Sequence, residues 1–235
     1  MKTYTNLKQI KVGELFFAIR DETSDIKAIK EVVVNQSYKR KDFKPEAGET
    51  WIDIGANCGA FCVWAASLGA QVIAFEPDPG NYEICSANIG MNKMQSMIKL
   101  FDAGLTESDS AAVAILHRNT AKGNLWRNSL YKKWRGGESV KVKINPVHKY
   151  WNSNNCIKLD AEGVEMPILE KYADVRLKKL VFEWSFDIDP SITRFEKIIE
   201  RLKAIYPNVK YAGYKSGCEK WQPEWFPACR TVWCY

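Results

Sequence analysis

The most informative stretch of the sequence is a short apolar strand that ends in an acid and runs into a glycine-rich turn, Asp53-Ile-Gly55-Ala56-Asn57-Cys-Gly59. Glycine lets the backbone form a tight turn and approach a ligand closely. The helix predicted after the turn presents unpaired N–H groups to a carboxylate or a phosphate at its N-terminus. These residue types in this order predict a ligand-binding loop.

A second acid narrows the kind of ligand. Glu76 follows the next predicted strand, about 20 residues after the loop, in Phe75-Glu76-Pro77. A carboxylate at this place accepts hydrogen bonds from both hydroxyls of a ribose, which indicates an adenosine-containing cofactor. The loop has the spacing DxGxxxG and lacks the GxGxxG spacing that binds a pyrophosphate. S-adenosylmethionine, which has no phosphate, therefore fits the loop better than NAD.

A third acidic segment, Lys158-Leu-Asp160-Ala-Glu162-Gly-Val-Glu165, follows a later strand. Residues two apart on a strand share a face, so Lys158 and Asp160 both face the ligand edge of the sheet. Methylating a hydroxyl requires removal of its proton, and a carboxylate either acts as the base or binds a divalent cation that acidifies the hydroxyl. Asp160 and Glu162 suit both roles, so metal dependence stays open. Glu165 either joins them or caps the next helix.

Two further side chains are candidates for catalysis. Glu183 ends the strand after this segment, where a buried carboxylate often has a shifted pKa and a function. A structural ion pair with a lysine is the alternative for Glu183. His117 begins a basic segment and is either a base near neutral pH or a surface histidine.

Three ordered motifs, Asp53-Ile-Gly-Ala-Asn57, Phe75-Glu-Pro-Asp-Pro79-Gly-Asn81 with Asn88, and Ile157-Lys-Leu-Asp-Ala-Glu-Gly-Val-Glu165, resemble those of the FkbM family of S-adenosylmethionine-dependent methyltransferases. The resemblance spans residues 20–185 and departs from the family at Cys85, where leucine is usual. It implies an α/β class I methyltransferase fold, which is Rossmann-like, with a seven-stranded, mostly parallel sheet and helices on both faces. Members methylate hydroxyl groups, often of sugars or polyketide-type products.

The resemblance also implies a set of cofactor-binding residues. Asp53, Gly55 and Asn57 are expected at the methionine end of the cofactor, and Glu76 at the ribose. Asp102 ends the third strand and is expected at the adenine amino group, with an exposed turn acid as the alternative. The full expected set is Asp53, Gly55, Ala56, Asn57, Gly59, Glu76, Pro77, Asp102 and Ala103.

The elements that must position these residues alternate along the chain. Alternating strands and helices favour a parallel sheet covered on both faces. We predict strands at 51–54, 71–75, 96–101, 156–159, 179–184 and 231–235, and helices at 60–68, 79–91, 164–172 and 192–205.

We expect one domain, 1–235, whose core is 46–235. One segment precedes the alternating pattern and another interrupts it. Residues 1–45 predict a β-hairpin around Val12-Gly13 and a short helix from Ser24 to Val34. Residues 111–149 predict an inserted hairpin with arms at 113–116 and 140–144. Between Arg118 and Lys143 lie eight basic residues and one acid. With Trp126, Trp134, Trp221 and Trp225, whose flat faces suit sugar rings, the insertion predicts a substrate-side lid.

Composition limits the class of protein. The chain has 235 residues, 46% hydrophobic and 26% charged, which excludes disordered, collagenous and coiled-coil proteins. No apolar run approaches the ~20 residues of a membrane span. Met1-Lys2-Thr3-Tyr4 leads into charged residues without a secretory signal, and the seven cysteines form no CxxC pair, so we expect reduced thiols and a cytoplasmic location. A net charge of +6 permits an anionic partner without requiring one.

These observations favour an O-methyltransferase that acts on a sugar or glycan. The alternative is a ribose 2′-O nucleic-acid methyltransferase, in which Asp160, Glu183, Lys179 and an N-terminal lysine surround the hydroxyl and the basic insertion binds phosphates. The modest net charge and the absence of a separate nucleic-acid-binding module weigh against it. A non-catalytic binding module is disfavoured because the acids at 53, 76, 160 and 162 are all present. The sequence leaves the oligomeric state open.

Overall fold

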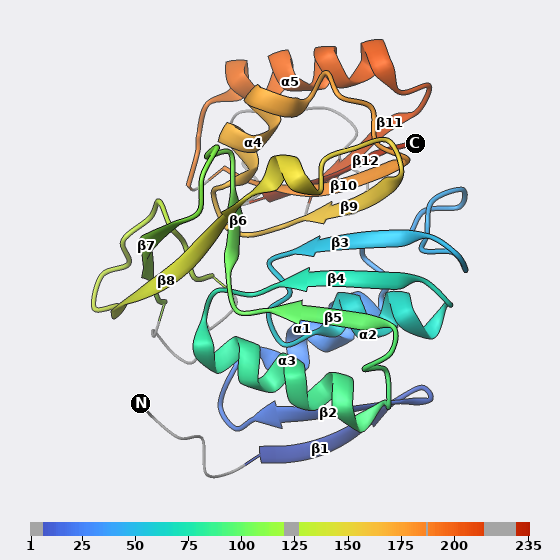
Figure 1. Ribbon diagram of the computed structural model, residues 1–235, viewed down its shortest axis with the longest axis vertical. Helices are drawn as coiled ribbons and strands as arrows, with labels where there is room; N and C mark the ends of the chain where they lie inside the picture. Colours follow the sequence, from blue (N-terminus) through green and yellow to red (C-terminus); the bar gives the residue numbers. More distant parts are fainter. Residues whose placement is uncertain (1–6, 120–126, 187, 214–228) are drawn as a thin grey trace.

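Seven strands form the central sheet of the protein, in the order β11-β12-β10-β9-β3-β4-β5 (Figure 1). The structure is a computed structural model that describes residues 7–119, 127–186, 188–213 and 229–235. The strands of this sheet are β3 (Thr50–Ile54), β4 (Gln71–Phe75), β5 (Ile98–Phe101), β9 (Asn155–Leu159), β10 (Lys179–Ser185), β11 (Val209–Gly213) and β12 (Cys229–Cys234).

The strand directions place the predicted motifs at one edge. The pairs β3–β4, β4–β5, β3–β9 and β9–β10 are parallel, and β12 runs antiparallel to both of its neighbours. The chain order reverses between β3 and β9, and ligands of open α/β sheets bind at such a switch point. This sheet confirms the predicted class I methyltransferase fold. The strand β11 was not predicted.

Alternate residues of each strand enter two separate cores. Trp51 faces one core and Ile52 the other, because successive side chains of a strand point to opposite faces. Helices cover both faces, and the predicted bounds agree with the observed ones within one residue (Figure 1). The helices are α2 (Ala60–Ser67) and α3 (Pro79–Met91) on the first core, and α4 (Glu165–Tyr172) and α5 (Ile192–Ile205) on the second.

The N-terminal hairpin is confirmed, but the helix after it differs from the prediction. The strands β1 (Leu7–Val12) and β2 (Leu15–Arg20) pair antiparallel. The expected helix to Val34 is split into α1 (Asp25–Ile29) and a π-helical turn, η1 (Lys30–Val34). Three consecutive valines at 32–34 explain the change, because β-branched side chains crowd the preceding turn of an α-helix. The side chain of Ser24 makes no capping hydrogen bond.

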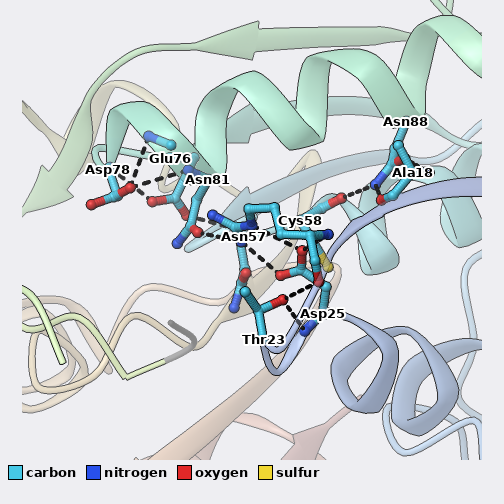
Figure 2. Close-up of polar contacts among 11 residues, drawn as sticks. Ala18, Thr23, Asp25, Asn57, Cys58, Glu76, Asp78, Asn81 and Asn88 are labelled. Atoms are coloured by element: carbon cyan, nitrogen blue, oxygen red, sulfur yellow. Dashed lines mark hydrogen bonds and ion pairs between the residues drawn. The ribbon is translucent and has the colours of Figure 1, made fainter. Parts of the chain in front are cut away.

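Side-chain amides of α3 and of Asn92, the residue after it, hold the hairpin against the glycine-rich loop. Asn88 Oδ1 accepts a hydrogen bond from the backbone N–H of Ala18 at 2.6 Å, and Asn88 Nδ2 donates to the carbonyls of Ala18 (3.2 Å) and Cys58 (2.8 Å) (Figure 2). Asn92 pairs with both backbone groups of Phe16 in the same way, at 2.9 and 2.6 Å. The hairpin, α3 and the loop therefore form one hydrogen-bonded unit.

The insertion forms a small sheet together with a short strand that precedes it in the chain. Its strands are in the order β6-β8-β7, and the predicted hairpin arms correspond to β7 and β8. The three-residue strand β6 was not predicted, and it pairs parallel to β8. A short 3₁₀ turn, η3 (Val147–Lys149), follows. The strands are β6 (Gly104–Thr106), β7 (Ala112–His117) and β8 (Ser139–Pro146).

None of the described helices is both long and apolar enough to cross a bilayer.

The Asn88 contacts predict an unequal cost for two similar substitutions. Asn88→Ala leaves three buried backbone groups without their partner, and we expect the free energy of unfolding to fall by about 3 kcal/mol. Asn92→Ala is the matched control, because water can replace its exposed contacts to Phe16, and its cost is about 1 kcal/mol or less. Urea unfolding of both variants checks the difference. Equal losses in the free energy of unfolding would contradict the role of Asn88 in holding the hairpin to the loop.

Candidate functional site

A cavity of about 340 Å³ opens where β3, β4, β9 and β10 end. Of the predicted residues, its lining includes the loop residues 55–57, Glu76, Pro77, Asp160, Glu162 and Glu183. Residues upstream of the predicted motifs also line it, among them Glu31 and Tyr38. The sheet and the turn η1 therefore bring together acids that are up to 152 positions apart in the sequence (Glu31 to Glu183).

The glycine-rich loop has a conformation that requires glycine. Gly55 has a φ of +85°, and a Cβ at this position would lie 2.0 Å from the carbonyl oxygen of Asp160. The N–H groups of Gly55 and Ala56 donate to the carbonyl of Phe75 at 3.1 and 3.0 Å. The loop thus lies directly against the ends of β4 and β9, and no larger residue fits at Gly55.

Glu76 lies buried under this loop, where it lines the cavity. Its Oε2 accepts a hydrogen bond from the N–H of Asn57 at 2.7 Å, and its Oε1 accepts one from the N–H of Asp78 at 2.9 Å (Figure 2). Burial, followed by the negative charge of Asp78, raises the pKa of Glu76 to about 7. A carboxylate has about four acceptor positions, so Glu76 retains capacity for a ligand's hydroxyls.

The resemblance implied that Asp53 contacts the cofactor, but Asp53 does not line the cavity. It points into the first core, fully buried, where its Oδ1 lies 3.2 Å from the ammonium of Lys158. Burial raises the pKa of Asp53, against the opposing effect of Lys158. Burial lowers the pKa of Lys158, but the carboxylates of Asp53 and Asp160 raise it overall, so the ammonium stays charged. Lys158 Nζ also donates to the carbonyl of Gly55 at 2.7 Å, which ties the loop to β9.

Asp160 lies at the end of β9 with its side chain 24% exposed to the cavity. Its Oδ2 accepts a hydrogen bond of 2.6 Å from the hydroxyl of Tyr38 and lies 3.8 Å from Lys158 Nζ. Its backbone N–H donates to the carbonyl of Ile54 at 3.1 Å. Sequence reasoning missed Tyr38, because it belongs to no motif and lies 122 positions away along the chain.

Glu162 and Glu165 have different surroundings. Glu162 is engaged by Arg127 Nε at 3.3 Å and by the hydroxyl of Ser185 at 3.2 Å. Glu165 does not line the cavity, and it accepts hydrogen bonds from the N–H groups of Ala161 and Gly163, each at 2.6 Å. Burial raises the pKa of Glu165 to about 8. Glu165 therefore orders the turn before α4, and α4 has no side-chain capping hydrogen bond at its N-terminus.

Besides Asp53 and Glu165, four predicted residues lie away from the cavity lining: Gly59, Asp102, Ala103 and His117. The imidazole Nδ1 of His117 pairs with the hydroxyl of Ser139 at 2.9 Å. The carboxylate of Asp102 is half-exposed and lies 3.2 Å from Lys143 Nζ, in agreement with the exposed-acid alternative. Ala103 is buried in the second core. The neighbours Gly104, Leu105 and Leu116 line the cavity instead.

The insertion supplies part of the cavity wall through Arg127, Asn128 and Leu130. Trp134 has the guanidinium of Arg127 5.1 Å from its ring centroid and the ammonium of Lys132 at 4.5 Å, a cation–π arrangement. The other expected lid residues, Trp126, Trp221 and Trp225, lie outside the described residues. Within the described ranges, no three His, Cys, Asp or Glu side chains group so that they could hold a metal ion.

Comparisons with known proteins agree with the geometry. A family model described as the methyltransferase FkbM domain matches residues 53–216. A methyltransferase from Sordaria araneosa, sdnD, is 25% identical in a match that covers 51% of this chain and 58% of that protein. The chain therefore spans just over half the length of this relative.

Solved structures with a similar arrangement include two of low sequence identity. Precorrin-6y C5,15-methyltransferase from Geobacter metallireducens has a TM-score of 0.47 and 14% identity, and the match covers 92% of each chain. TYW2 from M. jannaschii, solved in complex with AdoMet, has a TM-score of 0.49 and 12% identity, with 97% of this chain and 83% of that chain covered.

The loop geometry predicts that Gly55 tolerates no side chain. In Gly55→Ala the new Cβ collides with the backbone of Asp160, so we expect a loss of more than about 3 kcal/mol in the free energy of unfolding, or no folded protein. Gly48→Ala is the matched control, with a similar φ of +80° and open space around its Cβ, and it should cost about 1–2 kcal/mol. Thermal unfolding of both variants checks this, and a stable Gly55→Ala protein would contradict it.

Proposed function

The chain belongs to the FkbM methyltransferase family, and on this premise we propose that it is an S-adenosylmethionine-dependent O-methyltransferase whose acceptor is a hydroxyl group of a sugar or glycan. The observation that carries the proposal is the presence of Glu76 and Asp160 in one cavity at the carboxyl edge of the sheet. Glu76 offers acceptors to a ribose, and Asp160 offers a base to a hydroxyl.

The residues of the cavity fit S-adenosylmethionine. The cavity volume of about 340 Å³ lies within the range of small-molecule sites. Glu76 uses one position on each oxygen for backbone N–H groups, so it can still accept from both ribose hydroxyls. The backbone of Gly55 and Ala56 approaches the cavity without side-chain bulk, where the methionine end of the cofactor would lie. Asp53 supports that loop indirectly, through its ion pair with Lys158, and does not itself line the cavity.

Asp160 is the group we assign to proton removal. S-adenosylmethionine, when bound, supplies a methyl group on a positively charged sulfur. The acceptor hydroxyl would donate a hydrogen bond to Asp160. As its oxygen bonds to the methyl carbon, the carbon–sulfur bond would break with its electron pair left on the sulfur, which becomes neutral, and the O–H proton would pass to the Asp160 carboxylate. The ammonium of Lys158 places a positive charge 3.8 Å from Asp160 Oδ2.

The charge of the cavity favours a sugar over a nucleic acid. Among the described lining residues, five are carboxylates and two are basic, and both basic side chains are already paired with acids. A phosphodiester would meet unfavourable electrostatics there. The four-residue set of the nucleic-acid alternative also lacks Lys179, which lies at the opposite end of β10 and pairs with Glu49 at 2.9 Å.

The raised pKa of Glu76 predicts a pH-dependent affinity for the cofactor. The carboxylate accepts ribose hydroxyls only when ionised, so affinity for S-adenosylmethionine should rise about tenfold from pH 6 to pH 8. In Glu76→Gln the affinity should be weak and lose this dependence, whereas Glu83→Gln, an exposed residue of α3, should behave as wild type. Isothermal titration calorimetry checks both. A wild-type affinity that is flat with pH would remove Glu76 from ribose binding.

The assigned role of Asp160 predicts a variant that binds the cofactor but does not turn over. We expect Asp160→Asn to keep its affinity for S-adenosylmethionine within twofold and to lose at least about 100-fold in methyl transfer, as removal of a general base does. Asp109→Asn, an exposed acid far from the cavity lining, is the control. A fully active Asp160→Asn enzyme would take Asp160 out of catalysis.

The acceptor is identified by transfer of labelled methyl groups from S-adenosylmethionine to a panel of glycans and RNA, with and without EDTA. Label in the glycan fraction supports the proposal. Label in RNA alone overturns the sugar acceptor and favours the ribose 2′-hydroxyl. Loss of transfer in EDTA would assign Asp160 and Glu162 to a divalent metal instead of direct proton removal.

A further inference from the structure

Tyr38 reaches the catalytic cavity from outside the stretch that matches the family. It lies between η1 and β3, upstream of residues 53–216, and its side chain is 6% exposed. Its hydroxyl donates to Asp160 Oδ2 at 2.6 Å, across 122 positions of sequence. From this contact we infer that Tyr38 is a positioning residue that orients the Asp160 carboxylate for proton removal, an inference that rests on the proposed function.

The contact leaves one oxygen of Asp160 for the acceptor. Oδ2 is held by Tyr38 and faces Lys158, while Oδ1 makes no hydrogen bond with any described residue. The backbone of Asp160 is fixed by its N–H bond to Ile54 and by the close approach of Gly55. Rotation about the side-chain bonds is therefore the freedom that remains, and the Tyr38 hydroxyl removes it. Fixing the orientation of the base raises the rate of methyl transfer, because the reacting groups must meet in a narrow geometry.

Tyr38 is itself held in place by contacts with α2 and with the last strand, β12. Its ring packs edge-on against Phe61, with centroids 5.5 Å apart. Its carbonyl accepts a hydrogen bond of 3.0 Å from the indole N–H of Trp233, in the last strand. The guanidinium of Arg40 stacks on Trp233 at 4.1 Å. The strand β12 and the segment after η1 thus hold the tyrosine as a rigid donor.

The chemistry of the hydroxyl suits a donor. Burial, and next the charges of Asp160 and Glu183, raise the pKa of Tyr38 well above its usual range, so it keeps its proton near neutral pH. A tyrosine in this state donates its hydrogen bond to a carboxylate and does not compete with it as a base. Tyr38 and Asp160 therefore have separate roles, one of positioning and one of proton removal.

The test compares two tyrosine-to-phenylalanine substitutions. Tyr38→Phe keeps the ring that packs on Phe61 and removes only the hydroxyl. Tyr206→Phe makes the same change at a residue 3% exposed, whose hydroxyl accepts from the N–H of Leu177 at 2.8 Å and which does not line the cavity. Calorimetry gives the affinity for S-adenosylmethionine, and labelled methyl transfer to the best glycan of the panel gives kcat and KM.

We expect Tyr38→Phe to lower kcat by about tenfold or more, with KM and cofactor affinity within twofold of wild type. Tyr206→Phe should keep the wild-type kcat and lose about as much thermal stability as Tyr38→Phe does. This comparison separates a positioning role from a structural one. A Tyr38→Phe enzyme with wild-type kcat would overturn the inference while leaving the proposed function intact. An inactive wild type would overturn the proposed function, and the positioning role with it.

A second measurement needs no acceptor. The Tyr38 hydroxyl proton, protected by burial and by its short bond, should give a slowly exchanging downfield proton NMR signal that is absent in Tyr38→Phe. The signal should shift or disappear in Asp160→Asn and persist in Tyr206→Phe. A signal that Asp160→Asn leaves unchanged would contradict the pairing on which the inference depends.

Discussion

The buried ammonium of Lys158 is the interaction on which the site depends. A charge taken out of water is costly unless acids and hydrogen-bond acceptors surround it. Here Asp53 lies 3.2 Å from it, the Gly55 carbonyl accepts from it at 2.7 Å, and Asp160 is 3.8 Å away. One side chain thereby joins β3, the glycine-rich loop and the carboxylate of Asp160. Its burial gives the three parts a single relative position.

Segments beyond the matched domain complete the cavity around this centre. The hairpin β1–β2 is clamped to α3 through Asn88, which also holds the carbonyl of Cys58 in the loop (Figure 2). The segment after η1 supplies Tyr38, and β12 fixes Tyr38 through Trp233. The seven-stranded sheet thus presents the strand ends, and elements near both ends of the chain determine which side chains meet there.

Charge is distributed unevenly between the cavity and the rest of the molecule. The chain as a whole is positive by six charges, yet the described cavity lining has more acids than bases. Among the described basic residues of the insertion, Lys143 pairs with Asp102 at the surface, Lys132 stacks on Trp134, and Arg127 pairs with the cavity acid Glu162. A basic composition therefore says little about the ligand of this cavity, because the electrostatics of a site depend on the charges within a few ångströms.

The sequence alone predicted the fold class, the four long helices and the strand ends that carry the motifs, but not the strands β6 and β11. Strand and helix periodicities are local, so the helix predicted at 79–91 is observed as Pro79–Met91. Periodicity indicates which face a side chain takes but not what meets it there. Only the tertiary structure decided that Asp53 turns inward to Lys158, that Asp102 pairs at the surface with Lys143, and that Tyr38 reaches Asp160. Those contacts join residues 41 to 122 positions apart, and local preference carries no information about such pairs.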